Sequence, residues 1–242
     1  MSWAIDDDYE AFKRAAHHGH ALILPPPWLL HVWDVTDENP EGVWHVESNP
    51  QSLQSKARLR IVFAPFHDPE PCSLPSVLAL FRLLHVPSDF TTSVLQSVCH
   101  SFGRKTDNYG CCSWFHFLFK NISLKHQNGK LPEVDNRAAS AGYASSTLPQ
   151  ADYSWLKSSF FLRQHDDGGT VLVCFGAQPR VWQRIELFID SGKWADAGIN
   201  PYVLFDLVLD GLYFEVDETV WNMNTVFGPL EHVQWGDKSS GQ

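Results

Sequence analysis

Residues 155–175 read WLKSSFFLRQHDDGGTVLVCF, and this stretch decides the fold class. Two runs rich in aromatic and β-branched residues, Trp155–Gln164 and Thr170–Phe175, lie on either side of the DDGG sequence at 166–169. The glycines permit the positive φ that a tight hairpin requires, so the pattern predicts two strands joined by a turn. We interpret the aspartate pair as turn residues only.

Further strands and several helices are predicted around this hairpin. The apolar run Leu59–Phe63 predicts a buried strand, and Trp114–Leu124 alternates aromatic and polar residues as a strand does. Apolar residues at helical spacing predict helices over Ser73–Val86, from Ser88 or Asp89 to Gly103, and over Arg180–Ser191, Pro201–Glu215 and Asp217–Val233. These elements predict an α+β fold: an antiparallel or mixed sheet flanked by helices, with a helical C-terminal region.

The length of 242 residues and the 44% hydrophobic content favour one domain with a large core. We expect this domain over residues 1–235, with a mobile loop at about 125–150 and a disordered tail at 236–242. The sequence has no run of about 18 apolar residues, so no membrane-spanning segment is expected. It shows no basic region followed by an apolar segment at the N-terminus, so the cytosol is the expected compartment.

Sequence motifs of several common enzyme classes are missing. The chain has no GxxxxGK[ST] loop, no GxGxxG after a strand and no GxSxG elbow, which are the usual carriers of nucleotide, dinucleotide and serine hydrolase chemistry. The five cysteines include no CxxC pair, and the run His17-His18-Gly19-His20 lacks a carboxylate or thiol ligand at a defined spacing. We therefore expect reduced thiols and no metal or other cofactor.

An acidic cluster, Asp6-Asp7-Asp8-Tyr9-Glu10, precedes a helical pattern near the N-terminus. A helix start stabilises each negative charge by ~0.3–1 kcal/mol, because its first N–H groups and its dipole favour anions. Carboxylates held close together also repel one another, and this repulsion favours a cation nearby. The cluster is therefore either a helix cap or a binding site for a cationic group.

Two further sets of charged residues are candidate binding residues. Asp206 and Asp210 lie four residues apart on one face of the predicted helix Pro201–Glu215, as solvated surface charges or as ligands for a cation. The net charge of -10 argues against a general nucleic-acid binder, which needs a basic face. Basic residues gather locally, either to bind phosphates or merely to solubilise loops and edges: Lys56, Arg58, Arg60, Arg104 and Lys105.

Five stretches of the chain occur in an order that can be compared with known families. They are LRIVFAP (59–65), HSFGRK (100–105), WLKSSFFLRQH (155–165), TVLVCFG (170–176) and NPYVLFDLVLDGLYFEVDETVW (200–221). Their order resembles the fungal CorA-like domain family, and the resemblance runs from about Trp28 to Glu231. Transport-like members carry a magnesium-channel membrane segment and a GMN motif after this region. This sequence has neither, so the resemblance implies an α+β domain that does not conduct ions.

A stand-alone CorA-like domain with a DDxxE motif is also similar to the fungal arginine-containing cyclodipeptide synthases. That family requires the motif for activity, and Asp6, Asp7 and Glu10 fit its spacing. The resemblance implies that an arginyl group and a second aminoacyl group, both delivered by aminoacyl-tRNAs, are joined into a cyclic dipeptide. No ATP motif is needed, because the esters are already activated.

The same resemblance implies roles for the candidate residues. Asp6 and Asp7 would clamp the arginine guanidinium, and Glu10 would act as a base. Asp206 and Asp210 are second candidates for binding a cationic group. The basic residues Lys56, Arg58, Arg60, Arg104 and Lys105 would contact tRNA. The alternative is a non-catalytic CorA-like module that regulates or binds a partner, which the net charge of -10 favours.

Overall fold

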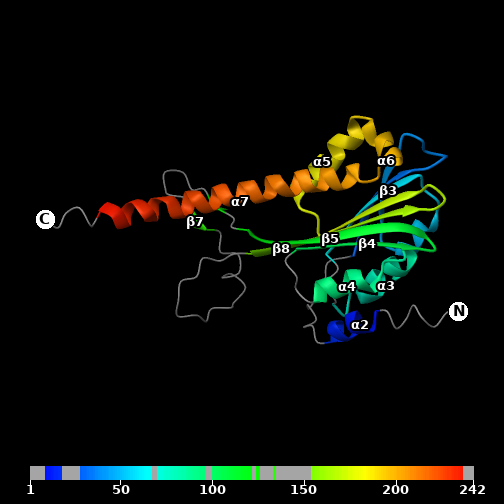
Figure 1. Ribbon diagram of the computed structural model, residues 1–242, viewed down its shortest axis with the longest axis horizontal. Helices are drawn as coiled ribbons and strands as arrows, with labels where there is room; N and C mark the ends of the chain where they lie inside the picture. The colour runs from blue at the N-terminus through cyan, green and yellow to red at the C-terminus, as the bar shows by residue number, and fades with distance from the viewer. Residues whose placement is uncertain are drawn as a thin grey trace. The chain divides into compact units, whose positions relative to one another are not determined.

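The computed structural model describes residues 9–17, 28–66, 70–95, 100–121, 124–125, 133–134 and 154–236. The strands of its main sheet are β1 Leu30–Val35, β2 Val43–Glu47, β3 Leu59–Ala64, β4 His100–Asp107, β5 Gly110–Asn121, β8 Ser154–His165 and β9 Thr170–Phe175. They form one seven-stranded mixed sheet in the order β2-β1-β3-β9-β8-β5-β4 (Figure 1). Two short strands, β6 Leu124–Lys125 and β7 Glu133–Val134, pair separately.

Helices follow and flank these strands. They are α2 Glu10–His17, α3 Leu74–Leu83, α4 Ser88–Leu95, α5 Pro179–Asp190, α6 Asp196–Ile199 and α7 Val203–Gly236, with 3-10 turns η1 Pro50–Gln54 and η3 Lys193–Ala195. The predicted α+β class, with its mixed sheet, flanking helices and helical C-terminal region, is confirmed. Among the residues described above, no helix is both long enough and apolar enough to cross a membrane.

The chain divides into two compact units. The first comprises Met1–Leu118 and Lys157–Gly211, and the second comprises Phe119–Leu156 and Leu212–Gln242. The prediction of one domain over 1–235 stays a prediction. The loop expected at about 125–150 and the tail expected at 236–242 lie almost wholly outside the described residues.

The centre of the first unit is the parallel pair β3 and β9. Every residue of both strands is buried, because helices cover both faces of the sheet at this point. Figure 1 shows α3 and α4 on one side of the sheet and α5 and α6 on the other. Val62 and Val173 belong to the core on the α3 side, together with Phe81 of α3 and Phe90 of α4. The two buried strands therefore form a rigid base for the loops that begin and end at them.

Two predicted helix boundaries are wrong. The helix that begins at Ser88 ends at Leu95 and not at Gly103, because residues 100–107 form β4 and pair with β5. Gly103 faces Trp114 across this ladder, and a β-carbon at Gly103 would lie 2.2 Å from the indole ring. Cross-strand pairing and packing thus override the helical preference of the local sequence. The two helices predicted over 201–233 are one helix, α7, since no glycine or proline separates them.

Candidate functional site

A buried ion pair stands at the beginning of β3. The guanidinium of Arg60 donates from Nε to Oδ1 of Asp34 at 2.7 Å and from Nη2 to Oδ2 at 2.8 Å. It also donates to the carbonyl of Leu53 and, at 3.1 Å, to the hydroxyl of Ser55. Arg60 and Asp34 are only 3% and 5% exposed. This geometry ties the loop after η1 to the sheet, because the planar guanidinium has few alternative arrangements.

A second buried arginine lies in β8. Arg163 is fully buried and donates from Nη1 and Nη2 to the two carboxylate oxygens of Asp107, at 2.9 and 3.0 Å. Its Nη2 also donates to the carbonyl of His85 at 2.7 Å. The bonds from Arg163 hold the pKa of Asp107 below its usual range. The pair joins the end of β4 to β8 and to the turn after α3.

A pocket of about 230 Å³ lies beside the Arg60 ion pair. Its walls come from η1, the loop that leads into β3, the end of α3 and the β8–β9 hairpin. The apolar part of the wall consists of Leu53, Ala57, Leu83, Leu84 and Val171, with Gly169 beside them. The polar part consists of Gln54, Ser55, Lys56, Arg60, His165 and Asp167. Polar and apolar groups thus share the wall, and convergent polar groups beside apolar surface can orient a small ligand.

The rim of this pocket carries one charge of each sign. The ammonium of Lys56 lies 2.9 Å from Oδ2 of Asp167, and these side chains are 70% and 58% exposed. The hydrogen bond from Lys56, with a second from the backbone N–H of Gly169, lowers the pKa of Asp167. Because exposed ion pairs contribute little to stability, a ligand can replace this pair at small cost.

His165 supplies a neutral polar group to the same pocket. Burial lowers the pKa of its half-buried imidazole, and the positive charge of Arg163 lowers this pKa further. A neutral imidazole offers one hydrogen-bond donor and one acceptor. The pocket can therefore recognise polar atoms at this position without adding a third charge to its rim.

The residues of the predicted acidic motif are only partly described. Asp6 and Asp7 lie outside the described residues. Glu10 is the first residue of α2, is exposed, and forms an ion pair of 2.8 Å with Lys13 three residues later. Tyr9 and Phe12 anchor this helix in the core, and the Glu10 carboxylate lies on the surface.

Asp206 and Asp210 do lie four residues apart on α7, and both are exposed. They differ in their surroundings, because Oδ2 of Asp210 forms an ion pair of 2.8 Å with Nε of Arg184 on α5. This contact joins α5 to α7 within the first unit. Asp210 is therefore engaged in a contact between helices, whereas Asp206 extends from an exposed position.

The five basic residues do not form one surface. The prediction for Arg60 is wrong, because its guanidinium is buried against Asp34 and does not face solvent. Lys56 is held at the pocket rim by Asp167, and Arg58 is exposed just before β3. These two residues lie near β3, the third strand of the sheet, whereas Arg104 and Lys105 lie on β4, the seventh.

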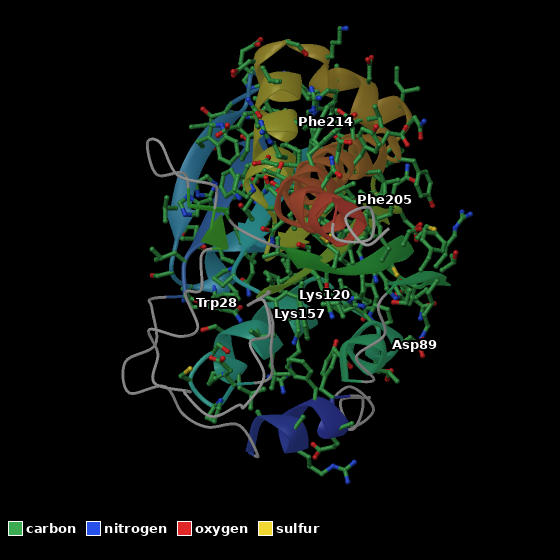
Figure 2. All side chains as sticks on the ribbon, turned by 90° about the vertical axis from the view of Figure 1, so that its left-hand side faces the viewer. Trp28, Asp89, Lys120, Lys157, Phe205 and Phe214 are labelled. Atoms are coloured by element: carbon green, nitrogen blue, oxygen red, sulfur yellow. The ribbon has the colours of Figure 1, made fainter. Side chains whose placement is uncertain are left out.

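Arg104 and Lys105 are also separated from each other. They are neighbours on one strand, so their side chains point to opposite faces of the sheet. Arg104 donates to Sγ of Cys111 at 3.3 Å, and Lys105 lies 3.6 Å from the carboxylate of Asp89, which α4 carries (Figure 2). The sheet thus distributes these charges over two ends and two faces.

The sequence interpretation missed Asp34, Asp107, Arg163 and His165. The available signal was a charged residue inside an apolar strand run: Asp34 in LHVWDV and Arg163 in FFLRQH. In a half-buried strand, alternate residues face the same side, so Arg163 must face the core side with Phe161. A charge at such a position requires a partner.

Comparisons with known proteins add no relative: no family model matches the chain, and no curated protein matches it. In the part of the chain that the structure describes, no three His, Cys, Asp or Glu side chains are grouped closely enough to hold a metal ion. The pocket beside Arg60 is a preformed space in which charged, polar and apolar groups meet.

Proposed function

We propose that this chain is a CorA-like binding module that holds a small ligand in the pocket beside Arg60. The observation that carries the proposal is the preformed wall of that pocket. The Arg60–Asp34 pair and the bond from Arg60 to Ser55 fix the loop that forms one side of the pocket. The α+β fold with its helical C-terminal region is the one expected from the family resemblance, which supports the CorA-like part of the proposal.

Three titratable groups in the core are held in unreactive states. Burial raises the pKa of the Cys174 thiol strongly and that of Cys112 as well, so neither forms the nucleophilic thiolate at neutral pH. Burial also lowers the pKa of His116 to about 4, and both of its ring nitrogens are already hydrogen-bonded within the core. These groups stabilise the fold and do not face the pocket.

Filling the pocket should abolish ligand binding. Ala57 lines the pocket, and Ala57→Phe places a ring in a space of about 230 Å³. Saturation-transfer NMR with a mixture of amino acids, carboxylic acids, sugars and nucleosides should show contacts with the native chain, weakened about tenfold or more in Ala57→Phe. Ala195→Phe, on exposed η3, is the matched control and should leave the contacts unchanged. Contacts that survive Ala57→Phe, or none with the native chain, would refute the proposal.

The arginine-containing cyclodipeptide synthase is the second candidate. It is favoured by the exposed carboxylate of Glu10, which already holds the ammonium of Lys13 at 2.8 Å. A carboxylate that holds an amino group at the surface suits a motif that binds a cationic substrate and accepts its proton. In this proposal Asp6 and Asp7 clamp the guanidinium of an arginyl-tRNA ester.

Incubation of the chain with charged tRNAs tests this second candidate. Mass spectrometry should detect a cyclic dipeptide when Arg-tRNA is supplied, and Lys-tRNA should be a poor substitute because an ammonium lacks the fork of a guanidinium. Glu10→Gln should lower product formation about 10²-fold or more, as expected for a lost base. Glu186→Gln, on an exposed face of α5, is the control. Absence of any cyclic product would leave the binding module as the function.

A further inference from the structure

The charges on the pocket rim select among classes of ligand. Lys56 and Asp167 both line the pocket and form an ion pair with each other at 2.9 Å. Behind them, the charge of Arg60 is balanced by Asp34. The groups that a ligand meets therefore amount to one positive and one negative charge on a neutral background.

A ligand with only one charge would be poorly matched to this rim. An anion that bound Lys56 would separate it from Asp167 and leave the carboxylate without its cation, and a cation at Asp167 would do the same to Lys56. A ligand that carries an ammonium and a carboxylate replaces one ion pair with two. A bound ligand also displaces water from these two side chains, so a ligand that keeps both charges paired avoids the cost of leaving one of them desolvated and unpaired.

The size and the interior of the pocket narrow the class further. A volume of about 230 Å³ corresponds to roughly eight water molecules, at about 30 Å³ each. This is below the range of pockets that hold drug-sized molecules. Leu53, Leu83, Leu84 and Val171 offer apolar surface to the remainder of the ligand. The space therefore suits a compact apolar side chain attached to the two charged groups.

We infer that the pocket binds a free α-amino acid with an apolar side chain, its carboxylate at Lys56, its ammonium at Asp167 and its side chain against the leucines and Val171. This inference rests on the proposed binding function and names its ligand class. Gln54, Ser55 and His165 lie around the same space and supply additional hydrogen bonds to the polar end of the ligand.

Calorimetric titration with leucine and two truncated analogues tests the inference. Leucine should bind, whereas 3-methylbutylamine, which lacks the carboxylate, and 4-methylpentanoic acid, which lacks the amine, should each bind about tenfold more weakly or worse. Lys56→Gln should weaken leucine about tenfold but should not weaken the amine, which no longer competes with Lys56 for Asp167. Asp167→Asn should weaken leucine but should not weaken the acid, which no longer competes with Asp167 for Lys56.

Matched controls and the remaining outcomes separate this inference from the proposed function. Lys193→Gln and Asp190→Asn alter exposed charges outside the pocket lining and should leave leucine binding unchanged. Equal affinity for leucine and either analogue would overturn the inference. So would a ligand from the NMR mixture that is sensitive to Ala57→Phe but is not an amino acid, although the binding function would then stand. Absence of any ligand sensitive to Ala57→Phe would overturn both.

Discussion

Asp34→Ala should lower the free energy of unfolding by about 3–5 kcal/mol, which is the usual cost of removing one partner from a buried ion pair. Asp34 accepts two hydrogen bonds from Arg60, and both side chains are almost completely buried. Without the carboxylate, the guanidinium stays buried with an uncompensated charge. Denaturant titration followed by circular dichroism measures the change, provided that the slope of the transition is unchanged.

Two companion variants show whether the charge itself is responsible. Asp37→Ala removes an exposed carboxylate three residues away and should change the unfolding free energy by no more than about 0.5 kcal/mol. The double variant Asp34→Leu with Arg60→Met removes both charges and should recover most of the loss, since apolar replacements of a buried pair are often neutral. If the double variant is as unstable as Asp34→Ala alone, the loss comes from packing or from the lost hydrogen bonds to Leu53, Ser55 and His45, and not from an unpaired charge.

The strands of this fold are predictable where their apolar content is high. LRIVF and TVLVCF lie at the centre of the sheet, covered on both faces, so their composition directly reflects their burial. β2 is the opposite case: VWHVE lies at the edge of the sheet with Val43, Trp44 and Val46 exposed, and we did not predict it. β4 was also missed, because its pairing with β5 depends on residues outside its own sequence.

The candidate site is harder to predict, because the sequence does not show which oppositely charged residue a buried charged residue will pair with. Arg60 lies two residues after Arg58, and the sequence predicts both at a basic surface, yet Arg60 belongs to β3, whose residues are all buried. Its partner, Asp34, is 26 residues away and becomes a neighbour only through the register of β1 against β3. The pocket likewise joins residues from 53 to 171, which no local pattern connects.

A buried histidine should make the stability of the protein fall in mild acid. His116, on β5, is 6% exposed. Its Nε2 lies 3.0 Å from the carbonyl of Phe90 and its Nδ1 lies 2.6 Å from the hydroxyl of Ser159. The carbonyl can only accept, so Nε2 carries the proton of the neutral ring and Nδ1 accepts from Ser159. Burial lowers the pKa from its usual 6.5 to about 4, because a second proton would bring a charge into the core.

The direction of the pH effect follows from this lowered pKa. Between pH 6.5 and about 4 the unfolded chain binds a proton at His116 and the folded chain does not, so protonation favours unfolding. The contribution is fully present above pH 6.5 and is lost progressively as the pH falls to about 4, by a total of about 3 kcal/mol.

His116→Gln keeps a donor for the Phe90 carbonyl but cannot titrate. Its unfolding free energy, measured by denaturant titration from pH 7.5 to 4, should therefore fall less steeply than that of the native chain. His31→Gln, at an exposed position of β1, serves as the control and should retain the native slope. If His116→Gln retains that slope too, His116 does not carry the acid sensitivity.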